Sequence, residues 1–161
     1  SAMAIAAGAT DQEIIDGLEA ASIEPGRMTP IQQVDTLLVD DTYNASPQAV
    51  RAAIDWLATC QGVRVLAMGG LSELGEVAES EMHMLGAYAK SKGIDRLVAT
   101  GTAMPIAEGY GADAQYFPTH DGVSDFLTEN VRDANVILVK GSRSAQMDRV
   151  ITALKLRQGG Q

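Results

Sequence analysis

The chain has 161 residues, with 12 basic and 21 acidic side chains and a net charge of −9. This length is typical of one domain, or of one domain with a short appendage, and a composition of 46% hydrophobic and 20% charged residues is that of a folded protein. The negative charge argues against a nucleic-acid groove, which needs clustered Lys and Arg, and against binding to an anionic membrane surface.

The cysteine content and the apolar runs predict the cellular setting. A single cysteine, Cys60, excludes an internal disulfide and paired-cysteine zinc motifs, so we expect a reduced, cytoplasmic protein. No apolar run reaches the ~18 residues of a membrane-spanning helix, and no signal-peptide pattern is present. Ser1 to Met3 are interpreted as a tag remnant, so we expect the chain to be part of a larger protein. We expect that protein to be monomeric.

The N-terminal part predicts one separate helix. Residues 4–22 begin as a small-residue stretch and become amphipathic, with Thr10 and Glu13 spaced as a capping box. Residues 24–30 contain two prolines and a glycine, which predicts a connection without regular structure. The helix is therefore expected to lie ahead of the main fold.

After this connection, strand and helix patterns alternate along the chain. Near-continuous apolar runs between helices are typical of a parallel sheet that is covered on both faces. We therefore expect an α/β fold with a Rossmann-like, open, mostly parallel sheet and helices on both faces. The predicted strands are 36–39, 63–68, 96–100, 115–117 and 136–139, and the predicted helices are 47–59, 76–92, 103–110, 122–130 and 144–157.

The first polar motif, Asp40 to Pro47, follows the first predicted strand, and ligands of open α/β sheets bind at the carboxyl ends of strands. A carboxylate such as Asp41 can accept hydrogen bonds from a ribose, and the Asn44 amide can recognise a base edge. The alternative is a simple capping turn, in which Ser46 caps the next helix, because Asp, Asn, Ser and Pro are common in such turns.

The second motif is the glycine-rich segment Gly69 to Glu76. It lacks the spacing of a dinucleotide-binding fingerprint, and the chain contains no P-loop motif for a nucleoside triphosphate. Glu73 is either a ligand-binding acid or a carboxylate that suits the start of a helix. His83 lies in that helix, where a lone histidine serves either packing or substrate binding.

The third motif, Val139 to Arg143, places a lysine, a glycine, a hydroxyl and an arginine where a strand leads into a helix. Lys140 and Arg143 stand out in a chain of net charge −9, and arginine offers a planar fork for a carboxylate or phosphate. We therefore expect an anion site here. By contrast, we expect His120 to be solvated and Trp56 to pack on the sheet.

The three motifs together resemble the C-terminal domain of the Mur ligase family, specifically the type that adds D-alanyl-D-alanine. Asp40 to Pro47 follows the family pattern D-D-[ST]-Y-N-A-N-P at seven of eight places, and Ser46 replaces the second Asn. In the pattern G-D-M-x-E-L-G, Gly70 and Leu71 replace Asp and Met. The remaining matches are His83 with Gly86 (H-x-x-G) and Val139 to Arg143 (V-K-G-S-R) with Met147. The resemblance covers about residues 4–157.

The resemblance implies a role within a longer enzyme. The family uses ATP and Mg²⁺ to join D-alanyl-D-alanine to a UDP-N-acetylmuramoyl-tripeptide through an acyl phosphate, in peptidoglycan precursor synthesis. Its P-loop and metal ligands lie in a central domain, so no metal ligands are expected in this chain, and the chain alone is expected to be inactive. The expected division is residues 1–30 as tag remnant, terminal helix of the central domain and hinge, and residues 31–161 as the C-terminal domain.

The resemblance and the residue chemistry together give each site residue an expected role. Nucleotide contacts are expected from Asp41, Tyr43 and Asn44. Lys140 and Arg143 are expected to stabilise charge on the dipeptide carboxylate or the transferred phosphate, and the expected substrate-binding residues are Ser46, Glu73, His83 and Ser142.

Two alternatives stay open at this stage. Another Mur-type ligase or a folylpolyglutamate synthetase would share the domain, although the first motif speaks against both. A free-standing receiver or flavodoxin-like module would also place acids after the first strand and a lysine after the last, as Asp40, Asp41 and Lys140 do. A receiver, however, needs an Asp after the third strand, where this chain has Ala99, Thr100 and Gly101.

Overall fold

A six-stranded sheet forms the centre of the described part of the chain, in the order β1-β2-β6-β3-β4-β5. The structure, a computed structural model, describes residues 24–131 and 133–158, so the helix expected at 4–22 lies outside the described residues. The strands are β1 (Thr29–Gln32), β2 (Leu37–Asp41), β3 (Arg64–Met68), β4 (Arg96–Thr100), β5 (Gln115–Phe117) and β6 (Val136–Lys140). All neighbours pair in parallel except β1, which pairs antiparallel to β2.

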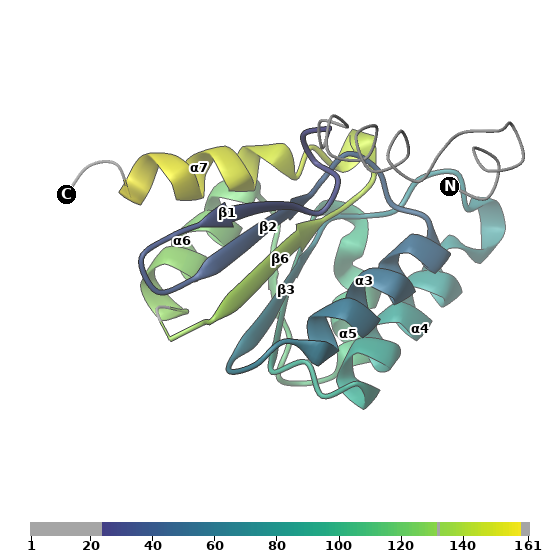
Figure 1. The fold of residues 1–161 in the computed structure, drawn as a ribbon. Helices are drawn as coiled ribbons and strands as arrows, with labels where there is room; N and C mark the ends of the chain where they lie inside the picture. The colour runs from purple at the N-terminus through teal and green to yellow at the C-terminus, as the bar shows by residue number, and fades with distance from the viewer. Residues whose placement is uncertain (1–23, 132, 159–161) are drawn as a thin grey trace, which may run out of the picture.

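Helices cover both faces of this sheet (Figure 1). Helices α3 (Pro47–Thr59), α4 (Ala78–Ser91) and α5 (Met104–Tyr110) lie on one face, and α6 (His120–Asn130) and α7 (Asp148–Gln158) lie on the other. Short 3₁₀ turns at Gly75–Val77, Gly101–Ala103 and Arg143–Ala145 precede α4, α5 and α7. The expected α/β fold, with a mostly parallel sheet and helices on both faces, is confirmed.

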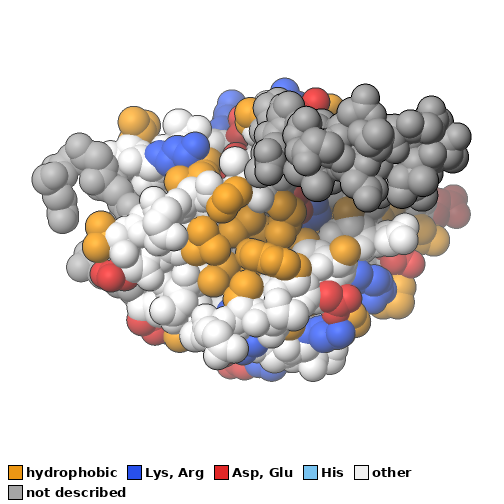
Figure 2. Space-filling view, in the orientation of Figure 1, with side chains coloured by type: hydrophobic (Ala, Val, Ile, Leu, Met, Phe, Trp, Pro, Cys, Tyr) orange, Lys and Arg blue, Asp and Glu red, His pale blue; other side chains and the backbone are white. Residues whose placement is uncertain are grey.

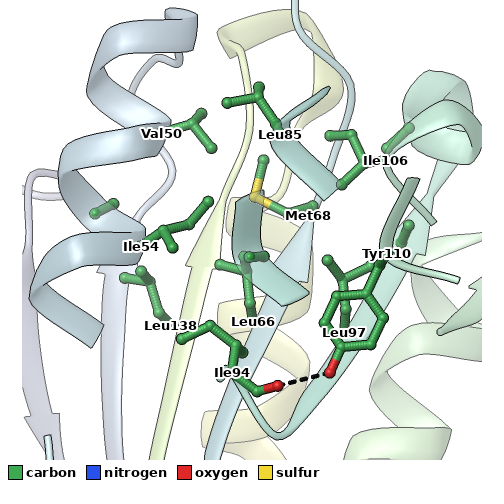
Figure 3. Packing of buried hydrophobic residues seen from close by; sticks show 14 of the residues in the cluster. Val50, Ile54, Leu66, Met68, Leu85, Ile94, Leu97, Ile106, Tyr110 and Leu138 are labelled. Carbon is green, nitrogen blue, oxygen red and sulfur yellow. Dashed lines mark hydrogen bonds between the residues drawn. The ribbon is translucent and has the colours of Figure 1, made fainter. Parts of the chain in front are cut away.

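The core consists of two apolar layers, one on each face of the sheet. Because side chains alternate along a strand, Leu66 and Met68 of β3 point towards α3, α4 and α5, whereas Val65 and Ala67 point towards α6 and α7. Figure 3 shows the first layer, in which the Tyr110 hydroxyl also donates a hydrogen bond of 2.7 Å to the carbonyl of Ile94. All five residues of β6 are buried, as expected for a central strand covered on both faces.

The structure corrects several boundaries, three of which bear on the site. The segment expected to be an irregular connection ends in β1, which Pro30 can join because β1 is an edge strand. The last predicted helix begins at Asp148 instead of Ser144, because Gln146 has a φ of +49° and interrupts it. The strand predicted to end at Val39 continues to Asp41, which places the first two acids of the motif inside the sheet.

The strand order excludes the receiver and flavodoxin-like alternative. If the parallel strands β2 to β6 are numbered one to five, their order is 1-5-2-3-4, whereas flavodoxin-like sheets follow 2-1-3-4-5. The observed order places β6 between β2 and β3. After β2 and β3 the chain continues to α3 and α4 on one face of the sheet, whereas after β6 it continues to α7 on the other face. Because the connections diverge to opposite faces at β6, a ligand site is expected at the carboxyl end of this strand.

Candidate functional site

A buried ion pair joins the first and third motifs. The Lys140 Nζ lies 2.6 Å from Asp41 Oδ2 and also donates a hydrogen bond to the carbonyl of Asn44 at 2.9 Å. The side chains of Lys140 and Asp41 are 3% and 13% exposed. The other Asp41 oxygen accepts the N–H of Met28 at 3.2 Å. The structure therefore brings these two predicted site residues together, and their charges compensate each other within the protein.

Part of the first motif holds its own loop, as in a capping turn. The Ser46 hydroxyl accepts the N–H of Ala49 at 3.2 Å and caps α3. Asp40 Oδ1 accepts the Thr42 hydroxyl at 2.7 Å. Tyr43 and Asn44, by contrast, are exposed residues that line the hollow next to this loop. The capping interpretation is thus confirmed for Ser46, whereas nucleotide binding by Tyr43 and Asn44 stays a prediction.

The first hollow has a volume of about 550 Å³ and lies between α3, the carboxyl end of β2 and the two residues that precede β1. On the face of the molecule drawn in Figure 2, hydrophobic side chains gather in the middle, over the strands next to α3. The apolar wall of the hollow comprises Met28, Ala45, Ala49, Ala52, Ala53 and Trp56, and its polar rim comprises Arg27, Asp41, Tyr43, Asn44, Ser46 and Lys140. A volume of this size, with an apolar wall and few polar groups, is typical of a small-molecule site.

Two residues of this hollow are additions to the predicted site. Trp56 was expected only to pack on the sheet, and it does contact the core, but it also lines the hollow. The Arg27 guanidinium lies 4.1 Å from the centre of the Tyr43 ring, and that of Arg143 lies 5.9 Å from the same centre. Two cations therefore lie close to one exposed aromatic ring that lines the hollow.

The second hollow, of about 680 Å³, lies between the loops that follow β2, β3 and β6. It shares Asn44, Ala45 and Ser46 with the first, so the first motif separates the two. Its lining has one cation and one anion, Arg143 and Glu73, with other lining residues Pro47, Ser72, Leu74 and Ser144. This pair of opposite charges fits a small zwitterion or a carboxylate ligand.

Hydroxyl groups fasten the second motif to the third. Ser142 is buried, and its hydroxyl donates to the carbonyl of Gly70 at 2.8 Å. The Ser144 hydroxyl lies 3.1 Å from that of Ser142 and 2.7 Å from that of Ser72. Ser142 therefore supports the wall of the second hollow from behind, and Ser72 and Ser144 form the wall itself.

Gly70, which replaces an aspartate of the family pattern, lies against Thr102. A Cβ at position 70 would lie 1.8 Å from the Thr102 hydroxyl oxygen. A side chain can be accommodated there only if Thr102 moves, so the two positions depend on each other. Glu73 is then the one acid of this loop that lines the second hollow.

His83 lies away from both hollows. It is an exposed residue of α4 and is absent from the lining of either hollow. Its carbonyl faces Gly109 of α5, where an added Cβ would lie only 1.9 Å from the oxygen. The structure thus places His83 at the crossing of two helices, where its backbone contributes to their packing.

Neither a metal-binding cluster nor a membrane-spanning helix is found in the described part of the chain. Within residues 24–131 and 133–158, no three His, Cys, Asp or Glu side chains are grouped so that they could hold a metal ion. Over the same residues, no helix is long and apolar enough to cross a membrane.

Comparisons with known proteins agree with this arrangement. Residues 26–143 match the family model described as the Mur ligase, glutamate ligase domain. The chain is 38% identical, over 96% of its length, to the UDP-N-acetylmuramoyl-tripeptide–D-alanyl-D-alanine ligase of Escherichia coli, and spans 35% of that protein. The crystal structure of MurF from Acinetobacter baumannii superposes with a TM-score of 0.84 at 33% identity, covering 95% of this chain and 35% of that one.

A more distant relationship concerns one of the alternatives. The bifunctional folylpolyglutamate synthase/dihydrofolate synthase of Yersinia pestis has a TM-score of 0.66 at 25% identity, covering 91% of this chain and 34% of that one. It is a weaker match than the ligases that act on D-alanyl-D-alanine. The matched family model and the identity to these ligases show that the chain belongs to the Mur ligase family.

Proposed function

We propose that this chain is the part of an ATP-dependent ligase that covers the nucleotide and binds the incoming D-alanyl-D-alanine. The longer enzyme would add this dipeptide to UDP-N-acetylmuramoyl-tripeptide, as the names of the relatives state for those proteins. One observation carries the proposal. Two separate hollows meet at Asn44–Ser46, above the strand position where an open α/β sheet binds ligands.

The first hollow suits an adenine nucleotide. Its alanines and Trp56 give a flat apolar wall for a purine ring, and the Asn44 side chain and Arg27 offer polar groups at the rim. A related MurF structure, from Thermotoga maritima, is described as a complex with ADP, and it superposes with a TM-score of 0.82 at 26% identity. Bound ATP would supply the phosphoryl group that activates the tripeptide carboxylate.

Asp41 takes a modified role in this proposal. Its two carboxylate oxygens already accept hydrogen bonds from Lys140 and from the N–H of Met28, so Asp41 fixes the position of the rim. Only a small part of its side chain is exposed and could contact a ribose. Tyr43, whose ring lies near the guanidinium groups of Arg27 and Arg143, is an exposed ring in the same lining.

The second hollow suits a short peptide with a free carboxylate. Arg143 can bind that carboxylate through two parallel hydrogen bonds, and the Ser72 and Ser144 hydroxyls lie in the same wall. Glu73 lies in the same lining and can attract the ammonium end of the dipeptide. Closing the domain over the hollows would exclude water and protect the activated carboxylate from hydrolysis.

The remaining parts of the proposal concern the longer protein. We propose that Mg²⁺ and the UDP-linked tripeptide bind mainly to the preceding domains, and that the enzyme is a cytoplasmic monomer. The C-terminal domain would begin ahead of β1, because residue 30 lies inside that strand and Arg27 and Met28 line the first hollow. The segment before residue 24 would then belong to the end of the central domain and the hinge.

An Arg143→Ala substitution in the longer ligase tests the role of the second hollow. We expect the KM for D-alanyl-D-alanine to rise about tenfold or more, which corresponds to about 1.4 kcal/mol, while the KM for ATP changes little. Arg149→Ala is the matched control, because Arg149 is an exposed arginine of α7 outside both linings. An unchanged dipeptide KM in Arg143→Ala would contradict the assignment.

The isolated chain gives a second test. With the tripeptide substrate, D-alanyl-D-alanine and ATP present, we expect the 161-residue chain to release no ADP, because it contains no P-loop. Sustained turnover by this chain alone would contradict the proposed division of labour.

A further inference from the structure

The turn that carries Arg143 and Ser144 is held, on the side that faces the end of β3, by the second motif. The N–H of Ser142 donates to the carbonyl of Gly70 at 3.0 Å, in addition to the bond from its hydroxyl. The Ala145 side chain lies over Gly69, where an added Cβ would come within 2.7 Å of it. These contacts fasten one side of the turn to the carboxyl end of β3.

His120 holds the other side of the same turn. Its Nε2 lies 2.7 Å from the carbonyl oxygen of Ala145. Because a carbonyl only accepts hydrogen bonds, Nε2 must carry the proton in this contact, and both the Nε2–H tautomer and the imidazolium can donate. His120 is the first residue of α6, and its own carbonyl accepts the hydroxyl of Ser124 at 2.9 Å, so the ring projects from an anchored helix end.

The contact links a fourth loop to the site. His120 follows β5, which is separated from β6 by β3 and β4 in the sheet, and none of the three motifs includes this loop. The turn it holds adopts costly geometry, because Gln146 directly after Ala145 has a left-handed φ of +49°. A turn of this kind keeps its shape only where surrounding contacts determine it.

We propose that His120 is a positioning residue that, through the carbonyl of Ala145, fixes the turn aiming Arg143 and Ser144 into the second hollow. Its relevance to dipeptide binding rests on the proposed function of Arg143, whereas its effect on the turn does not. The chemistry required of position 120 is a hydrogen-bond donor at the distance of Nε2 from the backbone. Glutamine supplies such a donor, whereas phenylalanine supplies the ring without it.

The first measurement uses the 161-residue chain itself. In His120→Phe we expect amide hydrogen exchange in residues 143–146 to accelerate about tenfold relative to the unmodified chain, as one lost hydrogen bond allows. In His120→Gln we expect exchange to stay within about twofold of the unmodified rate. Asp121→Asn, at the exposed next residue, is the control and should leave the rate unchanged. Unchanged exchange in His120→Phe would overturn the proposal.

The second measurement uses the longer ligase. We expect His120→Phe to raise the KM for D-alanyl-D-alanine about 3- to 10-fold with little change in the KM for ATP, and His120→Gln to restore it. Faster exchange without a change in KM would overturn the positioning role, as would a His120→Gln enzyme as impaired as His120→Phe. If the unmodified ligase shows no dipeptide-dependent activity, the proposed function fails, and the exchange measurement alone decides whether His120 holds the turn.

Discussion

The ion pair between Lys140 and Asp41 changes the roles that the sequence predicted for these two residues. Each was identified from the sequence by its place at the end of a strand, Lys140 as a cation for the dipeptide carboxylate or the transferred phosphate and Asp41 as a nucleotide ligand. The pairing follows from the parallel register, which sets Asp41 directly opposite Lys140 on β2 and β6. Arg143 is therefore the cation of the third motif that lines the second hollow, while Lys140 holds the first motif in place.

We predict that Lys140→Met strongly destabilises the chain. The substitution leaves the Asp41 carboxylate buried without its cation, and breaking a buried pair in this way costs about 3–5 kcal/mol in the free energy of unfolding. Urea denaturation of the 161-residue chain measures this cost. The double variant Asp41→Asn with Lys140→Met should recover part of it, since no unpaired charge remains. A double variant no more stable than the single one would contradict this account.

The sequence did not predict that Trp56 lines the first hollow, and the reason lies in the pattern of α3. Ala49, Ala52, Ala53 and Trp56 have the spacing of one helix face, which is also the spacing of a core stripe. The buried stripe of α3 is Val50, Ala53, Ile54 and Leu57, so Ala53 belongs to both stripes and Ala49 and Ala52 lie outside the buried one. Only the sheet reveals that the first stripe faces an open hollow beside β1 and β2, because the sequence did not predict β1.

At the scale of elements, the crossing of α4 and α5 accounts for a motif that the sequence left ambiguous. A Cβ on Gly86 would lie 1.9 Å from the carbonyl oxygen of Ile106 and 2.7 Å from the N–H nitrogen of Tyr110. The H-x-x-G pattern of His83 and Gly86 thus serves the close approach of two helices in this structure. The glycine is required because the neighbouring atoms belong to backbone, which cannot rotate away.

We predict that Gly86→Ala lowers the free energy of unfolding by about 1–3 kcal/mol, the usual cost of overpacking, despite the better helix propensity of alanine. Urea denaturation is again the measurement. Ala87→Ser, at the exposed next position of α4, should change stability by no more than about 0.5 kcal/mol. An equally small effect of Gly86→Ala would contradict this account, because it would mean that α4 and α5 can move apart without a loss of stability.

Most elements could be predicted, and the exceptions have physical reasons. The buried strands β3, β4 and β6 and the helix α3, with its Ser46 cap and Pro47 start, lie within a residue of their predicted bounds. Strand β1 has four residues, one of them a proline, and exists because it pairs with β2, which no local pattern indicates. The break at Gln146 likewise depends on contacts from distant loops.

For the whole molecule, ion pairs at the amino ends of the strands predict the response to acid. The Arg64 guanidinium, which donates a hydrogen bond to Asp95, lowers the pKa of that carboxyl, and Arg96 lowers the pKa of Asp133 in the same way. A carboxyl whose pKa is lower in the folded state stabilises the fold above its ordinary value of 3.8. That contribution disappears as the pH falls through the lowered native value.

We therefore expect these pairs to leave the free energy of unfolding constant between about pH 5.5 and 7 and to make it fall as the pH drops below about 4. Urea denaturation across this range measures the change. In Arg64→Met, the pKa of Asp95 returns towards its ordinary value, so the decline with acid should become shallower. An unchanged decline in this variant would contradict the assigned cause.

The product that the whole enzyme forms is the most direct test of its proposed function. In the longer ligase that we propose contains this chain, ADP release should depend on both UDP-N-acetylmuramoyl-tripeptide and D-alanyl-D-alanine. Mass spectrometry should then find the tripeptide substrate extended by the dipeptide. ADP release that ignores D-alanyl-D-alanine, but responds to glutamate with a folate acceptor, would contradict the account.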